Sequence, residues 1–142
     1  MKKLIFALLF TVGASSAFAE VSITDAWARA TVPGQPVGAI YMKISSSTAT
    51  RMVSAETDAA KQVQVHDMHM HDGVMRMREH GQLDVTPGQT VELAPGGKHL
   101  MLMGLTKPLV AGESVTVKMT FEDAKNKKST SIVTVPIRAL RK

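Results

Sequence analysis

The sequence predicts an all-β fold, an antiparallel sandwich or barrel with Greek-key connections. Several segments are rich in β-branched residues and alternate apolar with polar side chains, as half-buried strands do. In one of them Val115 and Val117 alternate with Thr116 and Lys118. Turn-forming residues interrupt the chain about every ten residues, which is typical of sandwiches and barrels. No stretch shows the longer period of an amphipathic helix.

The predicted strands follow one another from residue 37 to the end of the chain. They cover residues 37–44, 61–65, 91–93, 100–103, 114–121 and 130–137. A hairpin is predicted at Asp72-Gly73, because a two-residue type I′ turn needs positive φ at both central positions and this dipeptide tolerates it. There is no repeat or linker, so residues 20–142 are expected to form one domain.

Residues 1–19 are predicted to be a cleaved export signal. Lys2 and Lys3 precede an apolar run, and Ala17-Phe18-Ala19 gives the small-x-small pattern cut by signal peptidase. The apolar run is about ten residues long, whereas a membrane span needs roughly 20. Cleavage would leave Glu20 first. Because the chain has no cysteine for lipid attachment, we expect a soluble periplasmic protein without a membrane anchor.

Composition argues against nucleic-acid binding and draws attention to methionine. Removing two lysines with the signal lowers the formal charge from +5 to +3, which is 15 basic minus 12 acidic residues. The basic residues are scattered and aromatics make up only 4% of the chain, so no dense basic patch with interleaved aromatics is expected. Six of the ten methionines fall between residues 68 and 103, close to histidines. This clustering weakens the usual explanation of methionine as a flexible core filler.

Four of these residues form a candidate metal site. They are His66, Met77, His99 and Met101, with ten, twenty-one and one residue between successive members. Two imidazoles and two thioethers are soft, neutral donors that favour monovalent copper over hard cations. Thioethers also cannot form disulfides, so they stay available in an oxidising compartment. The sequence therefore predicts a Cu(I) site.

The hairpin register brings the first two candidates together. A two-residue turn at Asp72-Gly73 sets Met68 opposite Met77 and His66 opposite Glu79. His66 and Met77 then lie diagonally on one face, roughly 7 Å apart at the backbone, within reach of a shared ion.

Strand alternation brings the other two together. His99 and Met101 share one face of their strand, while Leu100 and Leu102 point the other way, into the core. Both pairs are thus expected on faces turned away from the core, as a shallow site open to a partner. Because the histidines must be neutral to bind metal, affinity should fall below about pH 6.

Further donors surround the four. Met68 and Met103 are candidate alternative ligands during transfer. His69 and His71 share the opposite, solvent-facing side of the hairpin, where they either hold Cu(II) or Zn(II) weakly or are simply exposed turn residues. Trp27 and Tyr41 are expected in the core.

The order and spacing of the four candidates resemble the signature of the periplasmic copper chaperones called PCu(A)C. The resemblance extends over nearly all of the predicted mature chain. It includes residues 25–30 (DAWARA), 38–41 (GAIY), 72–78 (DGVMRMR) and 96–105 (GGKHLMLMGL). Unlike some relatives, this chain has no C-terminal tail rich in His and Met.

The resemblance implies a cupredoxin-like β-barrel without enzyme activity, with a Cu(I) site at His66, Met77, His99 and Met101. It also implies delivery of copper to an acceptor, the Cu(A) centre of cytochrome c oxidase, alone or together with a Sco-like protein. We expect a monomer.

Two other copper functions do not fit this sequence, and two alternative functions stay open. A blue-copper electron carrier needs a cysteine ligand, which is missing. An enzyme of the histidine-brace type needs an N-terminal histidine, whereas cleavage predicts Glu20. Copper buffering or resistance stays open, because the same site could hold copper without passing it on. A metal-free adhesion or assembly domain that packs its methionines also stays open.

Overall fold

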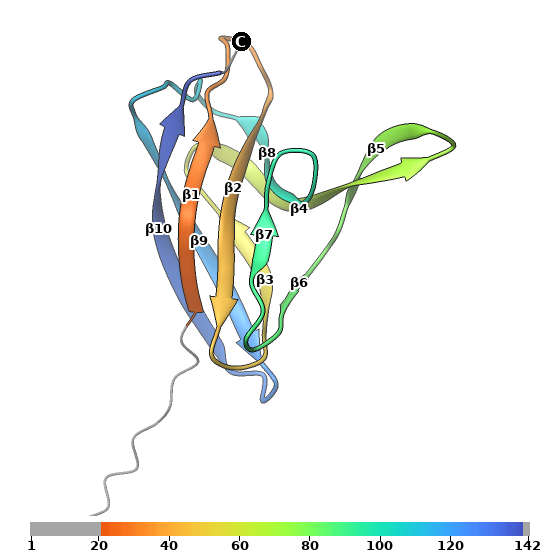
Figure 1. The fold of residues 1–142 in the computed structure, drawn as a ribbon. Helices are drawn as coiled ribbons and strands as arrows, with labels where there is room; N and C mark the ends of the chain where they lie inside the picture. The colour runs from red at the N-terminus through yellow and green to blue at the C-terminus, as the bar shows by residue number, and fades with distance from the viewer. Residues whose placement is uncertain (1–20, 141–142) are drawn as a thin grey trace, which may run out of the picture.

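The computed structural model describes residues 21–140, which form ten β-strands and no helix (Figure 1). The strands are β1 (Val21–Arg29), β2 (Val37–Ser46), β3 (Thr50–Glu56), β4 (Ala60–His71), β5 (Val74–Glu79), β6 (Leu83–Val85), β7 (Val91–Leu93), β8 (His99–Leu105), β9 (Ser114–Asp123) and β10 (Lys128–Arg138). The all-β prediction is confirmed. The predicted export signal and its cleavage site before Glu20 lie outside the described residues.

No helix between residues 21 and 140 has the length and apolar character needed to cross a membrane.

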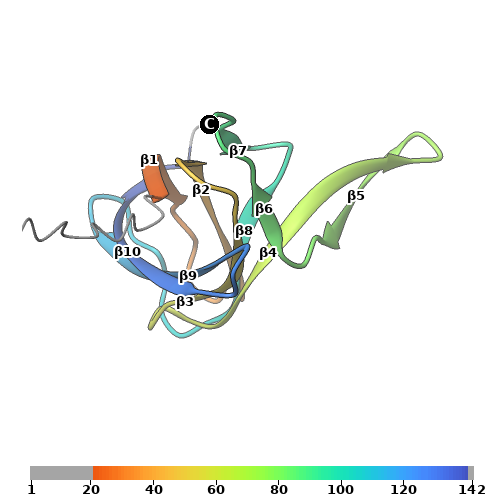
Figure 2. The same cartoon turned by 90° about the horizontal axis from the view of Figure 1, so that it is seen from below.

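The strands pair in the order β5-β4-β8-β2-β1-β10-β9-β3-β6, with β7 added beside β2. All pairings are antiparallel except β1 with β10. Figure 2 shows the strands curling round a common interior, which the apolar side chains fill. The largest fully buried side chains include Ile40, Ile44, Leu100, Leu102, Val117, Met119, Phe121 and Val135.

Every predicted strand lies within an observed one, but three observed strands were not predicted. The alternation in β1 breaks between Thr24 and Trp27, and that in β3 breaks between Met52 and Ser54, because each strand contains a register shift. A bulge moves the following residues to the other face, so a period of two does not run through the whole strand. The third, β6, has only three residues.

The bulge in β1 corrects the prediction that Trp27 lies in the core. Ile23 pairs with Ile44 on the core side, but after the bulge it is Ala28, paired with Ile40, that points inward. Asp25 has a φ of 52° in this bulge. Trp27 is therefore turned to the outer face of the sheet, directly opposite Tyr41.

The predicted hairpin exists and projects from the body as an arm (Figures 1 and 2). β4 pairs with β8 as far as His66, which also pairs with Glu79 of β5, and from Asp67 onward it pairs only with β5. Asp72 and Gly73 have φ values of 49° and 77°, as the predicted turn requires. The pairing of His71 with Val74 and of Met68 with Met77 confirms the predicted register. We call β4 from Met68, the turn and β5 the arm.

Candidate metal site

The four predicted ligands lie together where the arm meets the body. His66 on β4 pairs directly with His99 on β8, and their ring centroids are 6.0 Å apart. Met101 pairs with Gln64, two residues before His66, while Met77 pairs with Met68, two residues after it. Paired residues share a face and so do residues two apart in a strand. All four side chains therefore stand on one face of the sheet.

This face is hollowed by a cavity of about 250 Å³. Its lining includes Arg29, Tyr41, Met68, Met77, His99 and Met101. Three of the four predicted ligands thus border one space, and the ring of the fourth, His66, lies next to that of His99.

The site is deeper on one side than the sequence predicts. His99 and Met101 do face away from Leu100 and Leu102, but they are only 5% and 8% exposed. The prediction of a shallow site is therefore wrong for these two residues. Tyr41 from β2, itself buried, closes this side of the cavity. On the arm side Met77 is 46% exposed, so the site is open there.

A hydrogen bond orients the His99 ring. Its Nδ1 lies 3.1 Å from the carbonyl oxygen of Gly97. A carbonyl oxygen only accepts, so Nδ1 carries the proton and donates it. Nε2 is then left with a free lone pair, in the arrangement that metal-binding histidines commonly adopt. The tight turn between β7 and β8, closed by a bond from the Gly97 amide to Ala94, fixes this carbonyl.

In the His66 ring the roles of the two nitrogens are exchanged relative to His99. Its Nε2 lies 2.9 Å from the side-chain oxygen of Gln64, while its Nδ1 is buried and has no hydrogen-bond partner. Burial lowers the pKa of His66 below its ordinary value of 6.5, and the neighbouring His99 lowers it further, whereas Glu79 opposes the shift. The imidazole is therefore neutral near pH 7. A buried Nδ1 lone pair without a donor is a polar group that binding a cation would satisfy.

Oxygen ligands do not complete this site. Between residues 21 and 140, no group of three or more His, Asp or Glu side chains is placed to hold a metal ion. No carboxylate among the described residues lines the cavity, and its soft donors are the His99 imidazole and the thioethers of Met68, Met77 and Met101. This set fits Cu(I) and does not fit Ca²⁺ or Mg²⁺, which take oxygen ligands.

The auxiliary residues divide into two groups. Met68 lines the cavity, whereas Met103 shares the face but lies two residues beyond Met101, opposite Gln62 and outside the lining. His69 and His71 are on the other side of the arm. His71 contacts Asp72 at 3.3 Å and His69 pairs with the cationic Arg76, so neither belongs to a metal-binding group in the described chain.

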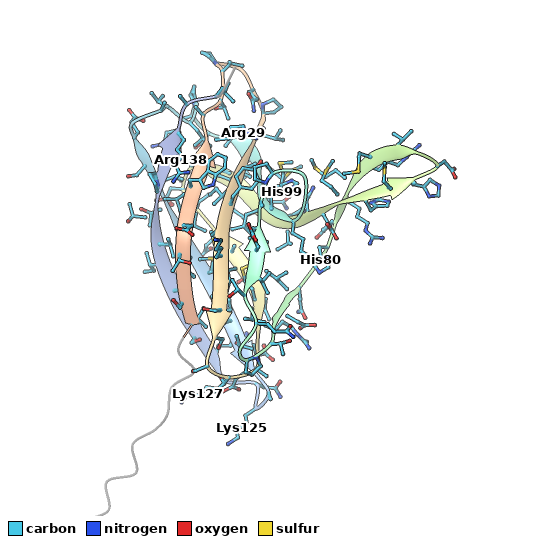
Figure 3. The ribbon with its side chains drawn as sticks, in the orientation of Figure 1. Arg29, His80, His99, Lys125, Lys127 and Arg138 are labelled. Carbon is cyan, nitrogen blue, oxygen red and sulfur yellow. The ribbon has the colours of Figure 1, made fainter. Side chains whose placement is uncertain are left out.

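An aromatic row beside the site was missed by sequence reasoning. The Trp27 and Tyr41 rings are 4.6 Å apart, and the Tyr41 and His99 rings are 6.2 Å apart. The guanidinium of Arg138 lies 5.3 Å from the Trp27 ring and that of Arg29 lies 5.8 Å from the Tyr41 ring. Figure 3 labels Arg29, Arg138 and His99 at this end of the sheet. No period in the sequence could have revealed the row, because the β1 bulge creates it.

The sequence is similar to proteins that are described as lipoproteins. The model of a family described as "Putative lipoprotein LpqE-like" matches residues 21–137. A protein of Leifsonia xyli subsp. xyli (strain CTCB07), described as "Putative lipoprotein Lxx21020", is 35% identical over 119 residues. That alignment covers 83% of this chain and 69% of the relative.

Comparisons of structure find PCuAC domains. The apo PCuAC domain from PmoF1 is similar with a TM-score of 0.67 and 20% identity, covering 84% of this chain and 94% of that domain. The copper-bound PCuAC domain from PmoF2 gives 0.66 and 21%, covering 84% and 93%. The solution structure of CuI-DR1885 from Deinococcus radiodurans gives 0.55 and 28%, covering 80% and 74%. The cupredoxin-like β fold expected from the sequence is thereby confirmed.

Proposed function

Since the chain belongs to the family of LpqE-like proteins and PCuAC domains, we propose that it is a copper carrier that binds one Cu(I) ion where the arm meets the body. The proposed ligands are His66, Met77, His99 and Met101. The family is non-enzymatic. Copper is the cargo of the protein.

The observation that carries the proposal is a group of soft donors that line one cavity or lie directly beside it. The buried Nδ1 of His66 has no partner, and the Gly97 carbonyl leaves Nε2 of His99 free. Met77 and Met101 border the same space. The relatives support the choice of metal, since one solved domain is described as copper-bound and DR1885 as its CuI form.

The geometry also suits release. Four neutral ligands leave the positive charge of the ion uncompensated, which limits affinity. His99 and Met101 form the buried half of the site, while the half-exposed Met77 belongs to the arm. An acceptor can therefore approach from the arm side and replace this thioether first.

The location and acceptor are part of the proposal. The description of the family and of the Leifsonia relative as lipoproteins supports a place outside the cytoplasm. We infer that the protein works in the periplasm after cleavage of residues 1–19 and passes copper to the Cu(A) centre of cytochrome c oxidase or to a Sco-like protein. Copper buffering or resistance is the alternative function.

Titration of the mature protein with Cu(I) against a chromophoric chelator tests the site. We expect one ion bound tightly enough to compete with the chelator, and H99A/M101A should lose this tight binding while the domain stays folded by circular dichroism. M103A is the matched control, because Met103 shares the strand and face but lies outside the cavity lining. Unchanged affinity in H99A/M101A would refute the ligand assignment.

A deletion strain separates delivery from buffering. Loss of oxidase activity at low copper, restored by added copper, is expected for a carrier. Normal oxidase activity together with sensitivity to high copper would instead support buffering.

A further inference from the structure

The arm carries four methionines on one face, and two of them lie beyond the site already described. Met70 pairs directly with Met75, one step further out than the pair of Met68 and Met77. Met70 and Met75 are 66% and 47% exposed. Figure 3 shows sulfur atoms along one side of the arm.

Packing does not account for these side chains. Every residue of β5 is exposed, and β5 is an edge strand that pairs with β4 alone. The core methionines, such as Met42 and Met119, are 1% and 0% exposed and do fill the interior. Single exposed apolar residues are ordinary. Four thioethers paired across a two-stranded arm are not explained in that way.

The spacing allows their sulfur atoms to meet. Directly paired residues have Cβ atoms about 4.5–5.5 Å apart, and residues two apart along a strand are separated by roughly 6.6 Å. Methionine has a flexible, unbranched side chain. The sulfurs of Met70, Met75 and Met68 can therefore converge above one face of the arm.

The surrounding charges favour a soft ion over a hard one. On this face the acidic side chain is Glu79, at the base of the arm opposite His66. The other face carries the cationic Arg76 and Arg78, paired with His69 and Asp67. Thioethers without carboxylates bind Cu(I) or Ag(I) and give little affinity for Zn²⁺ or Ca²⁺.

We propose that the arm holds a second, distal site for a soft monovalent ion, formed by Met70, Met75 and Met68. Met77 links the distal site to the cavity, because it pairs with Met68 and, like Met68, lines that cavity. Cu(I) would bind first at the exposed end and then move to His99 and Met101 by exchange of thioether ligands at Met68 and Met77. Copper remains Cu(I) throughout, so no electron or proton is transferred. The transfer role rests on the proposed carrier function.

Ag(I), which has no accessible redox change under these conditions, tests the distal site on the mature protein. In H99A/M101A we expect one Ag(I) to remain bound, at the weaker affinity of a site made of thioethers alone, with shifts of the ¹³C-methyl signals of Met70 and Met75. Adding M70L/M75L should abolish this binding, since leucine keeps the volume but lacks sulfur. H71Q is the matched control: it changes a donor at the same end of the arm, on the other face, and should have no effect.

The outcomes separate the two proposals. If wild type binds one Ag(I) and H99A/M101A binds none, the distal site is refuted and the carrier site stands. If H99A/M101A binds as much as wild type and M70L/M75L alone removes all binding, the arm site stands and the carrier site fails. Loss of binding in H71Q would refute the thioether assignment.

A rate measurement tests the transfer role. When the proposed ligands His66, Met77, His99 and Met101 are intact, M70L/M75L should still bind one ion but should take up Cu(I) from a chelator several-fold more slowly. An unchanged rate of uptake would refute the transfer role.

Discussion

His66 and His99 face each other across the β4–β8 ladder. Their ring centroids are 6.0 Å apart, and each ring is hydrogen-bonded through one of its nitrogens. The bonds to Gln64 and to the Gly97 carbonyl leave one nitrogen of each ring free. Two imidazoles this close resist simultaneous protonation, because the charge on one disfavours charge on the other. Burial and the neighbouring His99 together lower the pKa of His66, so that without metal this ring is kept in the neutral form that binds metal.

This coupling predicts how the pKa of His66 responds to substitution. Burial is the largest cause of the lowered pKa and His99 the second, while Glu79 raises it. H99Q should therefore bring the pKa part of the way back toward its ordinary value, and E79Q should lower it further. Titration of the His66 ring signals by NMR measures both. H71Q, at the end of the arm, is the control, and an unchanged pKa in H99Q would contradict the coupling.

The same shift makes the stability of the metal-free domain depend on pH. The pKa of His66 is lower in the folded than in the unfolded chain, so the unfolded chain takes up the proton first as pH falls. The free energy of unfolding should therefore decrease from about pH 6.5 down through the folded pKa, and then stop changing on account of this group. Urea unfolding of wild type and H66Q at pH 7.5 and pH 5 measures it. A decrease of equal size in H66Q would show that other groups cause it.

Much of this site follows from local sequence rules. The Asp72-Gly73 turn fixes the register of the arm, and that register sets Met68 opposite Met77. Alternation along β8 separates His99 and Met101 from the core leucines. These relationships depend on residues close in the chain, so they can be derived without a tertiary structure.

The rest depends on contacts between distant segments. The pairing of His66 with His99, thirty-three residues apart, requires knowing that β4 and β8 are neighbours. The burial of His99 depends on Tyr41 from β2, which no local pattern reveals. Trp27 was misplaced because one extra residue in β1 reverses the alternation.

The β1 bulge gives a prediction about backbone strain. Asp25 has a φ of 52°, a conformation that Asp and Asn tolerate and β-branched residues resist. D25V should lower the free energy of unfolding by about 1–2 kcal/mol, whereas D25N should change it little. Both variants remove the charge of the exposed contact with Lys43, so their difference isolates the backbone. Equal stabilities in urea unfolding would contradict the strained conformation.

The aromatic row predicts an optical signal for metal binding. Trp27 is the only tryptophan in the chain, and its ring contacts Tyr41, which in turn lies beside His99. A cation at His99 changes the field along this row, so Cu(I) should change the emission of Trp27 in proportion to occupancy. H99A/M101A should lose the change, and Y41F should keep it because the ring remains. An emission change that persists in H99A/M101A would mean that the ion acts on Trp27 from another position. Repeating the titration with M70L/M75L then shows whether that position is the distal site on the arm.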